Sequence, residues 1–223
     1  MNYQLQIYKN AFHSLENIFM ESQYNPDVDL YRSFDIMNSI NSAQMAGKEW
    51  LVDELIKVLS NEKNLRDGPI RDILVMGGWY GITGMLLRDK IDHDVKIWNI
   101  DSDPYCEIYG KMLHENIPEL EYNWFHTEDA LDYYFDRTDA FQLIINTSCE
   151  HMEQEDIDMI LSIKPPNTIV CFQSNNYHSV QSHINTHDTL EDFEKSLNLT
   201  RVWYSGKLPH FNGDYDRYMV IGI

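Results

Sequence analysis

The chain has 223 residues, 43% of them hydrophobic and 13% aromatic, which is enough to bury the core of one domain with a small extension. Its 17 basic residues stand against 36 acidic ones, for a formal net charge of -19. Nonspecific nucleic-acid binding depends on neutralising phosphates, so this charge argues against an extended nucleic-acid surface. An anionic membrane would repel the chain for the same reason.

Cysteine usage and the N-terminus bear on the compartment. The three cysteines, Cys106, Cys149 and Cys171, lie far apart, and two of them sit in apolar stretches, which favours buried thiols over disulfides. The first residues show no cationic leader followed by an apolar run, and no apolar run reaches membrane-spanning length. The sequence therefore predicts a cytoplasmic protein that does not enter a membrane.

The first 65 residues predict a helical extension. A short helix is expected from Ala11 to Met20, ending at Asn25-Pro26-Asp27. A stronger helix is expected over residues 41–60. It rests on apolar residues that recur at helical spacing, namely Val52, Leu55, Ile56 and Leu59. Because its first half is polar, we expect residues 1–65 to pack on or over a ligand pocket, and residues 66–223 to form the main domain.

An apolar strand, a glycine-rich turn and an amphipathic helix follow one another between Ile73 and Leu87. Gly77, Gly78 and Gly81 allow the chain to reverse sharply and the backbone to approach a ligand. The free N–H groups at the start of the helix suit the polar end of a ligand. This order is typical of a nucleotide-binding turn, although a tight turn without a ligand is an alternative.

Further strands are expected to alternate with helices after this turn. They are expected at residues 96–100, 121–125, 141–145 and 168–172, with a final hairpin at 200–205 and 218–223. The alternation predicts an α/β fold with a mostly parallel sheet, a C-terminal antiparallel hairpin and helices on both faces. Ligands bind such sheets at the carboxyl ends of the strands. Polar residues gather at those ends: Gly77–Gly81, Asp101, Asp129, Asn146–His151 and Gln173–Asn176.

Two of the strand ends carry specific expectations. Asp101 follows the glycine turn by about twenty residues, the spacing at which a carboxylate binds ribose hydroxyls. The polar loop over residues 173–186 is too long for a simple connector, and His178, His183 and His187 make it a candidate substrate lid. The spacing of these histidines matches no recognised metal geometry, so no metal is assigned.

These features together resemble the class I S-adenosylmethionine-dependent methyltransferases, over about residues 72–223. The resemblance implies a Rossmann-like fold with seven strands, the cofactor S-adenosyl-L-methionine and the product S-adenosyl-L-homocysteine. It implies that the glycine turn holds the methionine part, Asp101 the ribose, and Asp129-Ala130 the adenine. The cofactor-binding residues it implies are Met76, Gly77, Gly78, Trp79, Tyr80, Gly81, Asp101, Ser102, Asp129, Ala130 and Asn146.

The sequence departs from the family pattern in the turn. The family usually has an acidic residue just before the turn and glycine at its centre, where this chain has Val75 and Trp79. An aromatic ring from Trp79 or Tyr80 would suit the cofactor's sulfonium, because cations favour aromatic faces. The alternative is that Trp79 fills the core beneath the turn.

The end of the fourth strand is expected to line the reaction centre, where Glu150-His151-Met152 fits a run common in the family. Methyl transfer mainly needs alignment of the acceptor, and a base only when the acceptor must lose a proton. His151 is the candidate base, Glu150 would hold an acceptor amine, and Asn146 would bond to the acceptor or the cofactor. Purely structural roles at a helix start are the alternative for His151 and Glu150.

Four functional hypotheses remain. The leading one is a methyltransferase that acts on a small molecule or a protein side chain. Transfer of an aminopropyl or aminocarboxypropyl group from the same cofactor is the second, and a catalytically silent protein that binds the cofactor is the third. An NAD-dependent oxidoreductase is weaker, because the glycine spacing lacks G-x-G-x-x-G.

Overall fold

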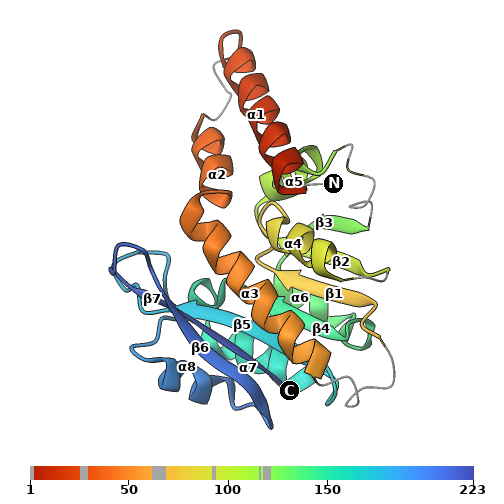
Figure 1. The fold of residues 1–223 in the computed structure, drawn as a ribbon, viewed down its shortest axis with the longest axis vertical. Coiled ribbons are helices and arrows are strands. Elements are labelled where there is room, and N and C mark those ends of the chain that lie inside the picture. Colours follow the sequence, from red (N-terminus) through yellow and green to blue (C-terminus); the bar gives the residue numbers. More distant parts are fainter. Residues whose placement is uncertain (1–2, 26–29, 62–68, 92–93, 116, 118–121) are drawn as a thin grey trace.

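The computed structural model describes residues 3–25, 30–61, 69–91, 94–115, 117 and 122–223. In this part of the chain a seven-stranded sheet is covered by helices on both faces, and two N-terminal helices project from one end (Figure 1). The strands are β1 (Asp72–Met76), β2 (Lys96–Asp101), β3 (Asn123–Thr127), β4 (Leu143–Asn146), β5 (Ile169–Asn175), β6 (Val202–Pro209) and β7 (Asp216–Gly222). The α-helices are α1 (Tyr3–Ser22), α2 (Tyr31–Ser39), α3 (Ser42–Asn61), α4 (Ile82–Lys90), α5 (Pro104–Leu113), α6 (Ala130–Phe135), α7 (Gln154–Ile163) and α8 (Leu190–Leu197).

The sheet has the strand order β3-β2-β1-β4-β5-β7-β6. Strands β1 to β5 pair in parallel, whereas β7 runs antiparallel to both β5 and β6. The chain builds the sheet outward from β1 in both directions, because β2 lies on one side of β1 and β4 on the other. The place where the strand order reverses is a topological switch point, and it opens a crevice at the carboxyl ends of the strands. The predicted α/β fold, with its mostly parallel sheet and C-terminal hairpin, is confirmed.

Alternate residues of the strands point into two separate cores, as the pleat requires. In β1, Ile73 and Val75 pack with α3, α4 and α5 on one face, whereas Leu74 and Met76 pack with α6, α7 and α8 on the other. All four side chains are fully buried. Strands buried on both faces read as continuous apolar runs, and the apolar run from which this strand was predicted has that cause.

Several boundaries differ from the sequence-based expectation. Helix α1 runs from Tyr3 to Ser22 instead of Ala11 to Met20, and β5 continues to Asn175. Helices α2 and α6 were not predicted, because each is too short to show a clear apolar pattern. Only one of the three buried residues of α2 is apolar. Residues 26 and 27, at the expected end of the first helix, and residue 121, the start of the expected third strand, lie outside the described residues.

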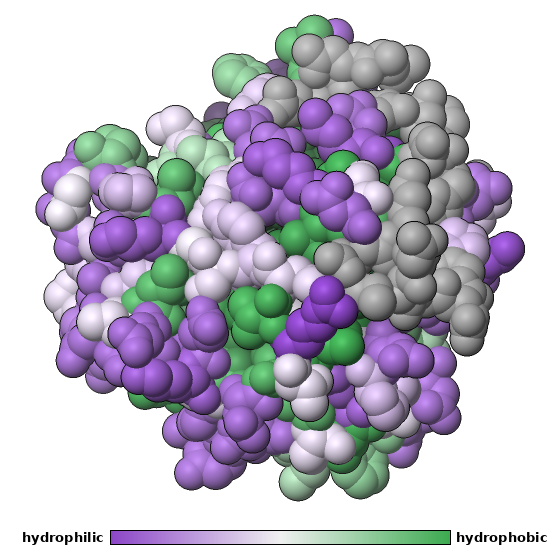
Figure 2. Space-filling model, turned by 60° about the horizontal axis from the view of Figure 1, so that its bottom comes forward, coloured by the Kyte–Doolittle hydropathy of each residue, from purple (hydrophilic) through white to green (hydrophobic). Residues whose placement is uncertain are grey.

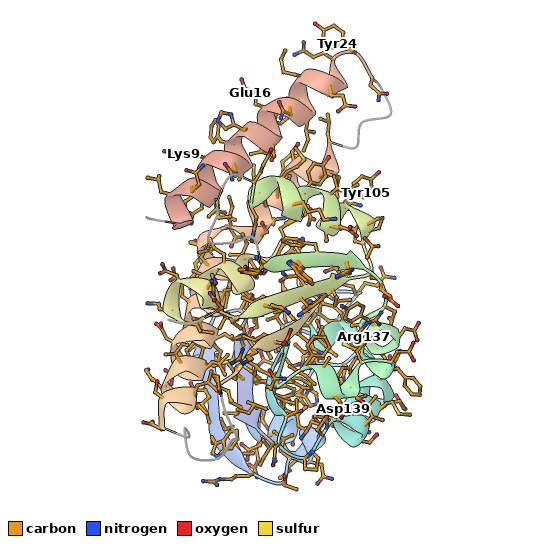
Figure 3. All side chains as sticks on the ribbon, turned by 90° about the vertical axis from the view of Figure 1, so that its right-hand side faces the viewer. Lys9, Glu16, Tyr24, Tyr105, Arg137 and Asp139 are labelled. Carbon is orange, nitrogen blue, oxygen red and sulfur yellow. The ribbon has the colours of Figure 1, made fainter. Side chains whose placement is uncertain are left out.

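The N-terminal helices are joined to the rest through α5 and α3. Helix α1 contacts α5 and α2. Figure 3 shows Lys9 and Glu16 along α1 and Tyr24 just past its C-terminal end, with Tyr105 of α5 nearby. The guanidinium of Arg32, on α2, lies over the Tyr105 ring, with Cζ 4.2 Å from the ring centre. Arg32 also forms an ion pair with Asp103, the N-cap of α5. On the face that Figure 2 shows, hydrophilic residues cover most of the described surface. Within the described helices, none combines the length and the apolar character needed to cross a bilayer.

Candidate functional site

The glycine turn after β1 is tightly constrained. Gly77 has φ 60° and Trp79 has φ 48°, both in the left-handed region. A Cβ on Gly77 would lie 2.3 Å from the Ser148 hydroxyl, and a Cβ on Gly78 would lie 2.7 Å from the Asn99 Cβ. These two glycines therefore let the turn approach neighbouring strand ends more closely than any side chain allows. A tryptophan with positive φ costs on the order of 1–3 kcal/mol and persists only where its surroundings hold it.

Two aspartates hold Trp79 in this conformation. The Trp79 N–H donates to Asp101 Oδ2 at 3.0 Å, and its indole Nε1 donates to Asp35 Oδ2 at 3.0 Å. The Tyr80 hydroxyl donates to the same Asp35 oxygen at 2.5 Å. Burial of the Tyr80 ring raises the pKa of its hydroxyl, and the bond to Asp35 raises it further. Two hydrogen bonds to Asp35 therefore link the turn to α2.

Asp101 ends β2 beside this turn, as the spacing predicted. Its Oδ1 accepts from the Asp103 N–H at 3.1 Å, while its Oδ2 accepts from the Trp79 N–H. Burial raises the pKa of the Asp101 carboxyl, and the two N–H groups act in the opposite direction. An ionised carboxylate offers about four lone-pair positions, so the carboxylate retains acceptor capacity after both bonds.

A cavity of about 250 Å³ lies at the carboxyl ends of β1, β4 and β5, beneath the first half of α3. Most of its lining residues are polar or charged, and they come from separate segments: Gln44, Gly47, Lys48, Gly77, Gly78, Trp79, Thr83, Asp101, Thr147, Ser148, Glu150, His151, Gln173 and Arg217. Six residues predicted for the site therefore meet at one cavity. They are Gly77, Gly78, Trp79, Asp101, Glu150 and His151.

The other predicted cofactor residues do not line this cavity. Met76 is buried in the second core, Tyr80 is buried beneath the turn, and Gly81 is the N-cap of α4. Ser102 is exposed, and Ala130 begins α6. These residues remain predictions for cofactor contact.

Asp129 and Asn146, also predicted for the site, are engaged in local hydrogen bonds. Asp129 caps α6 by accepting from the N–H groups of Leu131 and Asp132. Asn146 is fully buried, where it accepts from the Ser148 N–H at 2.9 Å and donates to the Met152 sulfur at 3.1 Å. Asn146 therefore shapes the turn after β4 from within.

Two basic residues that were not predicted from the sequence also line the cavity. Lys48 comes from α3 and Arg217 from β7. The Lys48 ammonium donates to Gln44 Oε1 at 3.1 Å and lies 5.4 Å from the centre of the Trp79 ring. Burial, with a smaller effect of Arg217, lowers the pKa of Lys48 to about 7. A lysine on an amphipathic helix gives no sequence signal for such a position.

Glu150 and His151 form a 3-10 turn after β4, Cys149–His151. The Glu150 side chain is buried, and its Oε1 accepts from Asn175 Nδ2 at 2.7 Å. His151 is exposed, with Nδ1 2.9 Å from the Ser182 carbonyl oxygen. The loop after β5 brings His183 beside them, so that possible ligand atoms of Glu150, His151 and His183 all lie within 4.8 Å of one another. In the sequence, His183 is close to His178 and His187, and its proximity to Glu150 and His151 could not be predicted from that spacing.

This topology is the Rossmann-like fold of the class I methyltransferases, and comparison with solved structures supports the assignment of the fold. No protein-family model and no curated protein matches the sequence. The N-methyltransferase NodS from Bradyrhizobium japonicum WM9, in complex with S-adenosyl-L-homocysteine, is similar with a TM-score of 0.60 and 15% identity, over 96% of this chain and 97% of that chain. An O-methyltransferase from Bacillus cereus in complex with SAH has a TM-score of 0.59 and 12% identity, over 95% and 91% of the chains.

The same fold also serves another reaction. The [4+2]-cyclase SpnF is similar with a TM-score of 0.61 and 13% identity, over 82% of this chain and 83% of that chain. At identities this low the likeness establishes the fold alone, and activity has to be argued from the site.

Proposed function

We propose that this protein is an S-adenosylmethionine-dependent methyltransferase that acts on a small molecule or a protein side chain. The observation that carries the proposal is the meeting of the glycine turn and the Asp101 carboxylate at one polar cavity, at the switch point of the sheet. NodS and the Bacillus cereus enzyme, which share the fold, are both methyltransferases with S-adenosyl-L-homocysteine in their complexes.

The methionine and ribose parts of the cofactor have suitable groups in the cavity wall. The backbone of Gly77 and Gly78 would approach the methionine part, and the Asp101 carboxylate would accept from the ribose hydroxyls. Lys48 would pair with the carboxylate of the amino-acid end, since it lies next to the turn. The adenine contact implied for Asp129 and Ala130 stays a prediction.

The acceptor would enter on the side of Glu150 and His151. The His151 Nδ1 faces a backbone carbonyl, which only accepts, so Nδ1 carries the hydrogen and Nε2 keeps its lone pair. Nε2 would take a proton from the acceptor, and the buried Glu150 carboxylate would hold an acceptor amine. Asn146 would position both residues through the turn that it shapes.

Calorimetry with S-adenosylmethionine, S-adenosylhomocysteine and NAD tests the proposal. We expect micromolar binding of the first two, at about −8 kcal/mol, and none of NAD. Turnover with labelled cofactor separates the alternatives, because methyl transfer releases S-adenosylhomocysteine, aminopropyl or aminocarboxypropyl transfer releases methylthioadenosine, and a silent protein releases neither. Binding of NAD without binding of the sulfonium would refute the proposal.

The ribose contact is tested with Asp101→Ala. We expect this substitution to weaken S-adenosylhomocysteine binding by roughly 1–3 kcal/mol, because it leaves hydroxyls unpaired. Asp94→Ala is the matched control, since Asp94 is exposed and precedes the opposite end of the same strand. Equal affinities of the two variants would remove Asp101 from the ribose role.

A further inference from the structure

Three residues with metal-ligand chemistry meet at the rim of the cavity, although they come from two separate segments. Glu150 and His151 belong to the turn after β4, and His183 belongs to the loop between β5 and α8. One possible ligand atom from each lies within 4.8 Å of the others. Two imidazoles and one carboxylate are a common ligand set for transition metals.

Backbone hydrogen bonds hold the loop against the turn. The N–H groups of Ile184 and Asn185 donate to the Glu150 carbonyl oxygen at 2.8 Å and 3.1 Å. The Asn185 side chain also donates to Gln154 Oε1 at 3.1 Å. His183, directly before these two residues, is therefore kept beside Glu150 by the fold.

Both histidines are held in the tautomer that metal binding through Nε2 requires. The His151 Nδ1 lies 2.9 Å from the Ser182 carbonyl oxygen, and the His183 Nδ1 lies 2.9 Å from the Tyr177 carbonyl oxygen. Because a carbonyl oxygen only accepts, each Nδ1 carries a hydrogen and each Nε2 presents a lone pair. Metal-binding histidines commonly have their second nitrogen fixed by such a bond.

The Glu150 carboxylate completes the set. It is 4% exposed, and its Oε1 accepts from Asn175 Nδ2. Its Oε2 is buried and has no hydrogen-bond partner among the described residues. An unpaired buried carboxylate oxygen is costly, and coordination of a cation would relieve that cost.

We propose that Glu150, His151 and His183 bind one divalent transition-metal ion. The imidazole ligands suit zinc, iron or cobalt, whereas magnesium, calcium and manganese prefer sites made of oxygen atoms. Metal–ligand bonds of about 2.0–2.2 Å would draw the three ligand atoms to within roughly 3.5 Å of one another. The exposed side chain of His151 can make that adjustment.

The ion would also define the class of acceptor, a consequence that rests on the proposed function. Three protein ligands leave coordination positions for water or an acceptor oxygen. Since Glu150 and His151 line the cavity, an acceptor hydroxyl bound to the ion would have a lower pKa and would release its proton to solvent. Its oxygen would then form a bond to the methyl carbon as the carbon–sulfur bond breaks, and S-adenosylhomocysteine would leave. His151 would then serve as a ligand in place of a base, and the acceptor would be a hydroxyl compound.

Metal binding can be measured without any cofactor. The full chain, freed of any purification tag and of metal, is titrated with cobalt(II) chloride while visible absorption is recorded, followed by competition with zinc chloride. We expect one equivalent of cobalt(II) to bind. Glu150→Gln keeps the acceptor for Asn175 and removes the ligand oxygen, whereas His183→Ala removes an imidazole ligand. Each substitution should weaken cobalt binding more than about 100-fold, which exceeds the usual effect of losing a hydrogen bond to a metal ligand.

His178→Ala is the matched control. His178 belongs to the same loop, but its Nδ1 bonds to the Thr186 hydroxyl and its Nε2 pairs with Asp188. Its substitution should leave cobalt affinity within about threefold, and circular dichroism should show every variant folded. Absence of cobalt binding in the wild-type chain, or equal losses in His178→Ala and His183→Ala, would overturn the metal site. Cobalt binding without S-adenosylhomocysteine binding would instead refute only the proposed function.

Discussion

Replacing Lys48 with methionine should stabilise the protein and remove a pH dependence that the wild-type chain carries between pH 7 and 9. Lys48 is 8% exposed, and its burial lowers the pKa from 10.5 to about 7. In the unfolded chain the ammonium is hydrated and has its ordinary pKa. Between the two pKa values the unfolded state binds a proton that the folded state lacks, so stability rises with pH in this range.

The size of the effect follows from linkage. One pKa unit corresponds to about 1.4 kcal/mol, so the contribution of Lys48 to the free energy of unfolding rises by roughly 2 kcal/mol from pH 7 to 9. Methionine has a similar length and no charge, and it therefore lacks this slope. The Lys48→Met variant should exceed the wild type most at pH 7 and below, and its advantage should shrink as pH rises.

Urea unfolding of both proteins at pH 7, 8 and 9 measures this difference. Only the difference between the two proteins is interpreted, because burial raises the pKa of Cys171 and Tyr134 in the fold, and their ionisation in the unfolded chain lowers the stability of both proteins equally as the pH rises. Lys57→Met is the matched control, since Lys57 lies on the same helix with an exposed side chain. A constant difference between wild type and Lys48→Met across the three pH values would refute the reasoning.

Two further substitutions probe the turn itself. Asp35→Ala should lower the free energy of unfolding by about 3 kcal/mol, since Trp79 and Tyr80 both lose a bond to a carboxylate; urea unfolding that matches the wild type would contradict this. Gly78→Ala should cost about 1–3 kcal/mol by overpacking, because the new Cβ would lie 2.7 Å from the Asn99 Cβ and 3.0 Å from its Cα. It should also weaken S-adenosylhomocysteine binding in calorimetry, and unchanged affinity would mean that the ligand does not approach the turn.

Local patterns in the sequence determined the order of the elements and the position of the glycine turn. Gly77 has a left-handed backbone conformation, and Gly78 packs too close to Asn99 for a side chain. Both conditions require glycine, so the two glycines in the sequence predict a tight turn. Asp101 was found because it ends an apolar strand about twenty residues after the glycine turn. The parallel sheet followed from alternation, which allows few topologies.

Tertiary structure alone decided which further residues, distant in sequence, meet at the glycine turn, in the cavity and beside it. Asp35, Lys48 and His183 come from α2, α3 and the loop after β5, and their roles depend on neighbours far away in the chain. Helix α2 is too short for its pattern to show, and its contacts with the turn and α3 hold it in place. The pKa of Lys48 depends on how much water the fold removes around it, a sum over many contacts that no local spacing encodes.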